Sequence, residues 1–413
     1  MPRVLRERDF RNLLLGQTAS MVGDRIVFVA LALYVTDIGS PSDVGIVLAA
    51  ATVPLIGFLA IGGVWADRLP RHHVMIATDL VRFALHAGLA ALIFTGAVEI
   101  WQIVVIEALF GTAEAFFQPA FTGLVPQTVP EELIQDARAA SGTIETVAEF
   151  AGPALAAALV LGLGAGWAFA LDAVTFVVSA TLLTRVRPRP RGEAPKRARW
   201  LDELREGWVE VRSRAWIWVT VAVFSIALMV SFGPWTTLGP TVGEHEYGSS
   251  GVYGLVAAAM GAGTMLGALL GFRFKPRHPM RTAFFCVLPW PLVTIAYAAG
   301  APLALVVVVF MLAGVGLSLF DIWWQTALAE RVPAHMLSRV SAYDWMGSLA
   351  LLPLGFALAG PLGEALGEAL VLAAGGVLAT LSIAAGLLVR ETWTMERLGS
   401  VSDQPAERHG LPL

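Results

Sequence analysis

Long apolar stretches alternate with short polar segments along the whole chain. A helix that crosses the hydrocarbon layer of a membrane needs about 20 mostly apolar residues. Stretches of about that length predict twelve transmembrane helices, at residues 13–36, 45–66, 74–96, 100–124, 140–163, 166–184, 215–238, 251–272, 282–299, 302–327, 341–361 and 367–389. We therefore predict an all-α, polytopic membrane protein.

A hydrophilic segment in the middle of the chain separates the predicted helices into two groups of six. Residues 1–184 are expected to form an N-terminal six-helix bundle and residues 215–390 a C-terminal one, followed by a tail at 391–413. The linker between the bundles, residues 185–214, starts with a basic, proline-rich tract and continues with apolar residues at helical spacing. That second part is typical of an amphipathic helix that lies in the headgroup layer.

The two halves carry traces of an internal repeat. At an offset of 203 positions, Val129-Pro130 aligns with Val332-Pro333, and residues 152–157 align with residues 355–360. An offset near half the chain length indicates a six-helix unit followed by a diverged copy. Pseudo-symmetric halves of this kind recur in transporters, where a central site is exposed to one side of the membrane at a time.

The charges support the same topology. Only 15% of the residues are charged and 56% are hydrophobic, whereas a soluble protein has about a quarter charged residues. Lysine and arginine favour the cytoplasmic side of membrane proteins. Of the 28 basic residues, all but Arg25 and Arg82 fall in the N-terminus, the loops after even-numbered spans, the linker or the tail. We expect a multi-pass protein of the cell membrane, in contact with lipid and with both termini cytoplasmic.

The loop after the second span carries a recognisable motif. It reads Gly63-Val-Trp-Ala-Asp67-Arg68-Leu-Pro-Arg71, and it resembles the loop signature of the major facilitator superfamily, in which Gly-x-x-x-Asp-Arg precedes a basic cluster. Gly63 would let two helix backbones approach closely. Asp67 would accept backbone N–H groups at a neighbouring helix start, and the two arginines would pair with acids. The resemblance implies a latch that opens and closes during transport.

Three further stretches resemble the drug:proton antiporter branch of that superfamily, the macrolide-efflux and enterobactin-exporter-like group. They are residues 16–24 in span 1, residues 116–120 at the end of span 4, and Gly152-Pro153 in span 5. The resemblance places Gly152 and Pro153 in the conformational gate. It implies a proton-coupled secondary transporter that exports amphipathic or hydrophobic organic compounds by alternating access. We also expect a monomer that has no cofactor.

Carboxylates inside the predicted spans need an explanation, because each costs about 2.5–3.5 kcal/mol or more at the middle of a bilayer. Asp24 in span 1 and Glu114 in span 4 are predicted to be cavity carboxylates that exchange protons. Glu145 and Glu149 lie one turn apart on one face of span 5. This pair is predicted either to be the proton site or to pair with Arg25.

Other polar and aromatic residues share faces with these acids. In the superfamily that the chain resembles, spans 1, 4, 7 and 10 line the cavity. The predicted substrate-cavity residues are Gln17, Ser20, Glu107, Gln118, Met229, Phe232, Trp235 and Trp324, with Asp321 as a further coupling carboxylate. Aromatic rings beside carboxylates suit an amphipathic, often cationic solute.

Two polar features are predicted to be structural. Asp79 and Arg82, three residues apart in span 3, are expected to form an ion pair. Asp172 is expected near the outer end of span 6, in a structural role or in contact with water at the interface.

The alternatives to multidrug export are export of a specific metabolite such as a siderophore, proton symport for uptake, and, more remotely, a membrane enzyme or sensor. Catalysis would require a nucleophile with a positioned base, or a metal cluster. The sequence shows no histidine or cysteine at metal-ligand spacing and no glycine-rich phosphate loop with lysine. It therefore disfavours an enzyme and an ATP-driven pump, and we expect no metal site. The basic linker is too short and too close to the membrane to favour nucleic acid binding.

Overall fold

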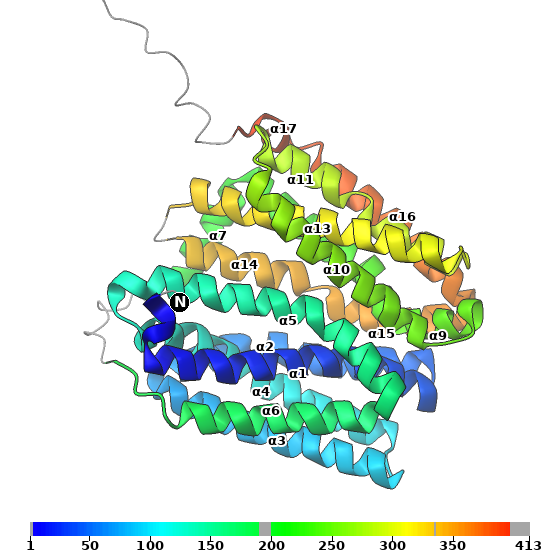
Figure 1. The fold of residues 1–413 in the computed structure, drawn as a ribbon. Coiled ribbons are helices and arrows are strands. Elements are labelled where there is room, and N and C mark those ends of the chain that lie inside the picture. The colour runs from blue at the N-terminus through cyan, green and yellow to red at the C-terminus, as the bar shows by residue number, and fades with distance from the viewer. Residues whose placement is uncertain (1–2, 190–199, 334–335, 397–413) are drawn as a thin grey trace, which may run out of the picture.

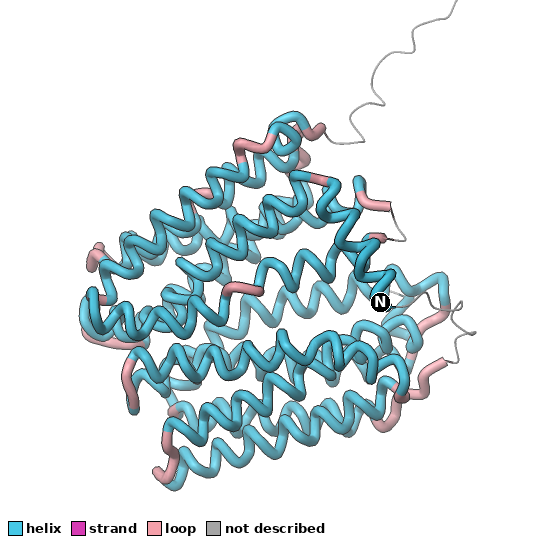
Figure 2. Tube along the Cα trace, turned by 180° about the vertical axis from the view of Figure 1, so that it is seen from behind, coloured by secondary structure: helices cyan, strands magenta, loops and turns pink. Residues whose placement is uncertain are grey.

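A computed structural model describes residues 3–189, 200–333 and 336–396. Helices lie side by side through the whole molecule (Figure 1), and the described residues form no strand (Figure 2). The all-α prediction is confirmed. The helices before residue 184 occupy one half of the molecule in Figure 1, and those after residue 215 occupy the other.

The first half contains one long helix for each of the six predicted spans. These are α1 (Arg8–Ile38), α2 (Pro41–Arg68), α3 (Arg71–Thr95), α4 (Ile100–Leu124), α5 (Ile134–Leu163) and α6 (Ala165–Leu183). Short 3₁₀ turns flank them at Arg3–Arg6, Val125–Thr128 and Glu131–Leu133. Local chemistry fixes several ends. Ser40 and Asp43 form a reciprocal capping box at the start of α2, and Gly96 ends α3 with a φ of 68°.

In the second half, three of the predicted spans are interrupted. The helical elements are α7 (Trp200–Ser213), α8 (Ala215–Ala227), η4 (Leu228–Phe232), α9 (Gly233–Tyr247), α10 (Gly251–Arg273), α11 (Pro279–Val287), η5 (Trp290–Leu292), α12 (Val293–Ala298), α13 (Leu303–Arg331), α14 (Leu337–Leu349), α15 (Leu352–Leu366), α16 (Glu368–Gly386) and α17 (Arg390–Thr394). The π-helical turn η4 joins α8 to α9 in span 7. Pro289 and Pro291 divide span 9, because proline cannot donate the backbone hydrogen bond of a continuous helix.

Eleven helical segments of the described chain are long and apolar enough to cross a membrane. Helix α5 supplies a further 30-residue helix where the twelfth span is predicted, and it packs against α1, α6 and α10. The structure is therefore consistent with twelve transmembrane helices.

Glycines allow the two halves to meet closely between α2 and α15. A Cβ atom on Gly45 would lie 2.2 Å from the carbonyl oxygen of Phe356, and one on Gly360 would lie 2.3 Å from Cα of Ser42. The backbone N–H of Ser42 also donates to Glu364 Oε1 at 3.2 Å. Small residues permit this approach of helix backbones in lipid. The halves thus touch at the end of the bundle where α1 ends and α2 begins.

Candidate functional site: a buried charge cluster

Four helices of the first half bring seven ionisable side chains together. We call them the charge cluster: Asp24 from α1, Asp79, Arg82 and His86 from α3, Glu107 and Glu114 from α4, and Asp172 from α6. Within α3 the members are three and four residues apart, which places them on one helix face. That face points into the bundle, where the side chains of Asp79, Arg82 and His86 are fully buried.

Arg82 connects three acids. Its Nη2 lies 2.5 Å from Asp79 Oδ1, and its Nη1 lies 2.7 Å from Glu114 Oε2 and 3.9 Å from Asp24 Oδ2. The predicted contact between Asp79 and Arg82 is present, but it is one part of a larger network. A buried guanidinium is stable only when it is paired and hydrogen-bonded, and the three carboxylates provide these partners.

Aromatic rings form the wall around Arg82. Its Cζ lies 3.9 Å from the ring centre of Phe117 and 4.5 Å from that of Phe176. Aromatic faces attract a cation and exclude water. Because the surroundings are apolar, the charges in the cluster interact more strongly than they would in water.

His86 joins two further acids, and sequence analysis missed it. Its Nδ1 lies 2.5 Å from Asp172 Oδ2, and its Nε2 lies 3.7 Å from Glu107 Oε1. The imidazole stacks on Phe110, with ring centres 4.2 Å apart and planes 3° apart. A signal for His86 was present, because it lies four residues after Arg82 on the polar face of α3. Its partner on α6 was not predictable, because hydropathy along span 6 does not show which face of that helix turns toward α3.

The cluster is most accessible at two of its acids. The side chains of Asp24 and Glu114 are 29% and 15% exposed, respectively, whereas those of Arg82, His86 and Asp172 are 0% exposed. Gln118, one turn after Glu114, is exposed and donates from Nε2 to Glu114 Oε1 at 2.5 Å. An ion or solute can therefore approach the cluster through Asp24 and Glu114.

Several predicted cavity residues instead lie inside the bundle. Gln17 and Ser20 are buried, and Gln17 Nε2 donates to Ser179 Oγ of α6 at 3.1 Å. Glu107 is also buried. The physical reason is that α6 presents polar side chains to α1 and α3, so the polar face of α1 has partners within the bundle. The prediction that Asp172 lies where it could contact water at the interface is wrong, because its side chain is fully buried against His86.

The structure describes only some of the residues predicted to form the gate. Arg71 Nη1 donates to the backbone oxygen of Gly123 at 2.5 Å, which ties the start of α3 to the end of α4. Arg68 is exposed. A Cβ on Gly152 would lie 2.2 Å from Cβ of Arg25, so this glycine allows α5 to approach α1. The side chains of Asp67 and Pro153 lie outside the described part of the structure.

The proposed packing role of Gly63 is wrong for this structure. Among the described residues, a Cβ atom at Gly63 would have no neighbour within 4 Å, whereas one at Gly62 would lie 2.1 Å from the carbonyl oxygen of Ala115. The helix faces differ by 100° between adjacent residues, and it is the face of Gly62 that meets α4.

The side chains of Glu145 and Glu149 also lie outside the described part. Both alternatives for them, a proton site or a pair with Arg25, therefore remain predictions. Among the side chains that are described, no group of three His, Cys, Asp or Glu residues is arranged to hold a metal ion.

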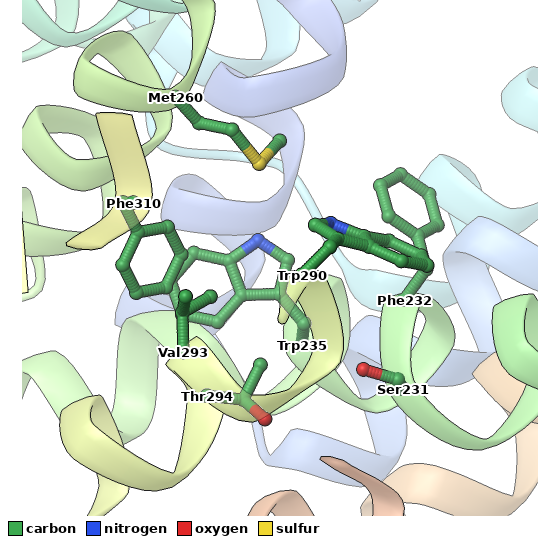
Figure 3. Close-up of a pocket in the computed structure, with 8 residues that line it drawn as sticks. All are labelled: Ser231, Phe232, Trp235, Met260, Trp290, Val293, Thr294 and Phe310. Carbon is green, nitrogen blue, oxygen red and sulfur yellow. The ribbon is translucent and has the colours of Figure 1, made fainter. Parts of the chain in front are cut away.

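Two of the aromatic residues predicted in the second half lie around a small pocket (Figure 3). Phe232 and Trp235 line it together with Ser231, Met260, Trp290, Val293, Thr294 and Phe310. The pocket volume of about 10 Å³ is roughly the space of one water molecule. It is therefore too small for an organic solute in this conformation, and the charge cluster lies in the other half of the molecule.

The other residues predicted in the second half lie outside this pocket. The backbone of Met229 lies close to Gly355 of α15. Trp324 is buried, and its Nε1 donates to Asp344 Oδ2 at 2.9 Å. Asp321 is exposed on α13. None of these residues is among the seven members of the charge cluster.

Helices that lie side by side, eleven of them in the described chain long and apolar enough to cross a membrane, are typical of a multi-pass α-helical membrane protein. Residues 13–350 match the Major Facilitator Superfamily. The chain belongs to this superfamily of membrane transporters.

Relatives with curated names include exporters. Macrolide efflux protein A of Streptococcus pyogenes is 23% identical over 270 residues, or 63% of this chain and 65% of that protein. The match therefore spans just under two thirds of that relative's length. Multidrug efflux pump Tap of Mycolicibacterium fortuitum is 26% identical over 342 residues, which cover 80% of this chain and 82% of Tap.

Solved structures share the fold at low identity. The crystal structure of nucleoside transporter NupG has a TM-score of 0.71 at 11% identity and covers 94% of this chain and 99% of NupG. An inward-facing, unoccupied bacterial homologue of the human lysosomal transporter Spinster has a TM-score of 0.70 at 16% identity, covering 95% and 97%. These similarities concern the fold alone.

Proposed function

We propose that the protein exports amphipathic, mostly cationic organic compounds in exchange for protons. The observation that carries this proposal is the accessible edge of the charge cluster, where Asp24 and Glu114 reach the surface of an otherwise buried network. The names of the macrolide and multidrug exporters support the direction of transport.

The charge balance of the cluster supports proton exchange. Five carboxyl groups surround one guanidinium and one imidazole, so full ionisation with a neutral His86 would leave four negative charges. Burying each unpaired charge costs several kcal/mol. Protons or a bound cation therefore have to neutralise part of the cluster. A cationic substrate and protons would compete for the same carboxylates, which couples the release of one to the binding of the other.

Alternating access would follow from movement between residues 1–184 and residues 215–390. The tight contact between α2 and α15 closes one end of the bundle in this conformation. We place that end at the outer face, because the predicted cytoplasmic loops carry the basic residues. Gly63, Asp67, Arg68, Arg71, Gly152 and Pro153 would form the gate on the other side. The transporter would work as a monomer in the cell membrane, without a cofactor.

Transport by purified protein in liposomes tests the proposal. Ethidium is a suitable probe because it is a flat aromatic cation, and erythromycin is a second probe in view of the macrolide exporters. We expect an acidic liposome interior to drive accumulation of ethidium at least fivefold above that in protein-free liposomes. Equal ethidium flux with and without the pH gradient would contradict proton coupling. If neither ethidium nor erythromycin were transported, multidrug export would be contradicted.

A further inference from the structure

His86 stands between two buried acids in a geometry that ion pairing alone does not require. Nδ1 contacts Asp172 at 2.5 Å, while Nε2 faces Glu107 Oε1 at 3.7 Å. Neither His86 Nε2 nor Glu107 Oε1 has a hydrogen-bond partner among the described residues. A buried polar atom without a partner costs about 1–3 kcal/mol. The free Nε2 edge of the imidazole therefore faces a carboxylate oxygen of Glu107 that likewise lacks a hydrogen bond within the described part of the chain.

We propose that Glu107, His86 and Asp172 form a proton path between the outer face and the cavity acids. The inference rests on the proposed proton coupling, and it identifies the route that the protons take. Spans 3 and 6, which carry His86 and Asp172, are not the helices predicted to line the cavity.

The positions of the three residues along the bundle agree with such a path. Glu107 lies seven residues from the start of α4, which corresponds to about 10 Å of helix. That start is at the end of the bundle predicted to face outward. At the other end of the path, a Cβ atom on Gly23 would lie 2.1 Å from Asp172 Oδ1, which places Asp172 directly against α1 beside Asp24.

Each transfer conserves protons. Protonated Glu107 gives its proton to Nε2 of His86, and the Nδ1–H of His86 gives its proton to the Asp172 carboxylate. The result is an ionised Glu107, a neutral imidazole with its proton on the other nitrogen, and a protonated Asp172. The Nε2–Oε1 distance has to shorten by about 1 Å for a hydrogen bond to form. The first tautomer returns only when Nδ1 takes up one proton and Nε2 releases one.

The groups around His86 favour a neutral resting imidazole that is protonated only in passing. Arg82 lies one turn away on the same helix, and a nearby cation opposes a second positive charge. Glu107 faces the ring from α4, and Asp172 faces it from α6. Glu114 and Asp24 are held by Arg82 and not by His86. The apolar face of Phe110 covers the ring itself.

The test compares two kinds of ethidium flux through the reconstituted full chain. Exchange of ethidium at equal pH requires binding and alternating access but no net proton movement. Accumulation driven by an acidic interior requires net proton movement as well. His86→Asn retains a donor near Asp172 and cannot pass a proton on. We expect exchange within twofold of the wild type, and at least a tenfold loss of gradient-driven accumulation. His245→Asn, at the exposed end of α9, is the matched control, and we expect it to behave as the wild type.

A second variant guards against a folding defect. Glu107→Gln leaves the contact of His86 with Asp172 in place, and the same pattern is expected. Normal gradient-driven accumulation by His86→Asn would overturn the path and leave proton coupling standing. Equal loss of exchange and accumulation in both variants would show a structural role and also overturn it. A wild type that ignores the gradient, or does not move ethidium, would overturn this inference together with the proposed function.

Discussion

Arg82 Nη1 lies 2.7 Å from Glu114 Oε2, and this contact joins the middle of α3 to the middle of α4 inside the bundle. Arg82 is fully buried, while Glu114 is partly accessible. One guanidinium thus links the interior of the charge cluster to its accessible edge. A change in the charge of Glu114, by proton or substrate binding, would be felt by Asp79 and Asp24 through Arg82.

Replacing Arg82 is expected to destabilise the fold. In Arg82→Gln, Asp79, Asp24 and Glu114 lose their shared cation, and removal of one partner of a buried ion pair costs about 3–5 kcal/mol. Thermal unfolding in detergent should show a clear drop in the melting temperature. Arg273→Gln, at the exposed end of α10, is the control and should leave the temperature unchanged. The double variant with Glu114→Gln should regain part of the loss, and no regain would contradict direct coupling between the two residues.

Adjacent glycines in α2 should respond differently to the same substitution. In Gly62→Ala, the new methyl group meets the carbonyl oxygen of Ala115 at 2.1 Å, so α2 and α4 have to separate. Overpacking of this kind costs about 1–3 kcal/mol. Gly63→Ala places the methyl group in open space and should leave thermal stability unchanged. Equal effects of the two substitutions would contradict the packing of α2 on α4.

Asp67 is expected to matter for the transport cycle and not for folding. We predict that Asp67→Ala is expressed, inserts into the membrane and melts like the wild type, but transports ethidium at least fivefold more slowly, because the gate loses an acceptor for backbone N–H groups. Glu131→Ala, another acid near the end of a first-half helix, serves as the control. Near-normal transport by Asp67→Ala at normal expression would remove the latch role.

We predict that the contact between α2 and α15 opens during transport. Ser42 and Glu364 are joined by a hydrogen bond of 3.2 Å, so cysteines at both positions, in a chain with Cys286→Ser, can be linked by a short thiol-specific cross-linker. We expect the linked protein to lose transport, and a cleavable linker to restore it on reduction. Each single cysteine variant treated in the same way is the control. Full activity while linked would mean that this end stays closed throughout the cycle.

The span pattern was predictable because hydropathy and length determine it almost alone. Helix α4 covers residues 100–124 as predicted. The interruptions of the second half were not predicted, although Pro289 and Pro291 mark one of them. The π-helical turn at Leu228–Phe232 has no comparable local signal, and both α15 and α16 pack against it.

The site was predicted less completely than the fold. Asp24 and Glu114 are expensive in lipid, and the resemblance placed spans 1 and 4 at the cavity. These two arguments together pointed to them. The arrangement around His86 depends on which faces of α3, α4 and α6 turn toward one another, and periodicity within one helix does not fix this. The prediction that Gly63 packs closely failed for the same reason, because the motif does not say which of two neighbouring glycines meets α4.

The most direct test of proton coupling is the accumulation of ethidium driven by a pH gradient in liposomes that contain the double variant Asp24→Asn, Glu114→Gln. These substitutions keep the shapes of the two accessible acids and remove their charge and their exchangeable protons. We predict that the gradient no longer drives accumulation, whereas a variant with the exposed acids Glu131→Gln and Asp136→Asn responds as the wild type does. Accumulation at the wild-type level by the double variant would contradict the role assigned to the accessible edge of the charge cluster.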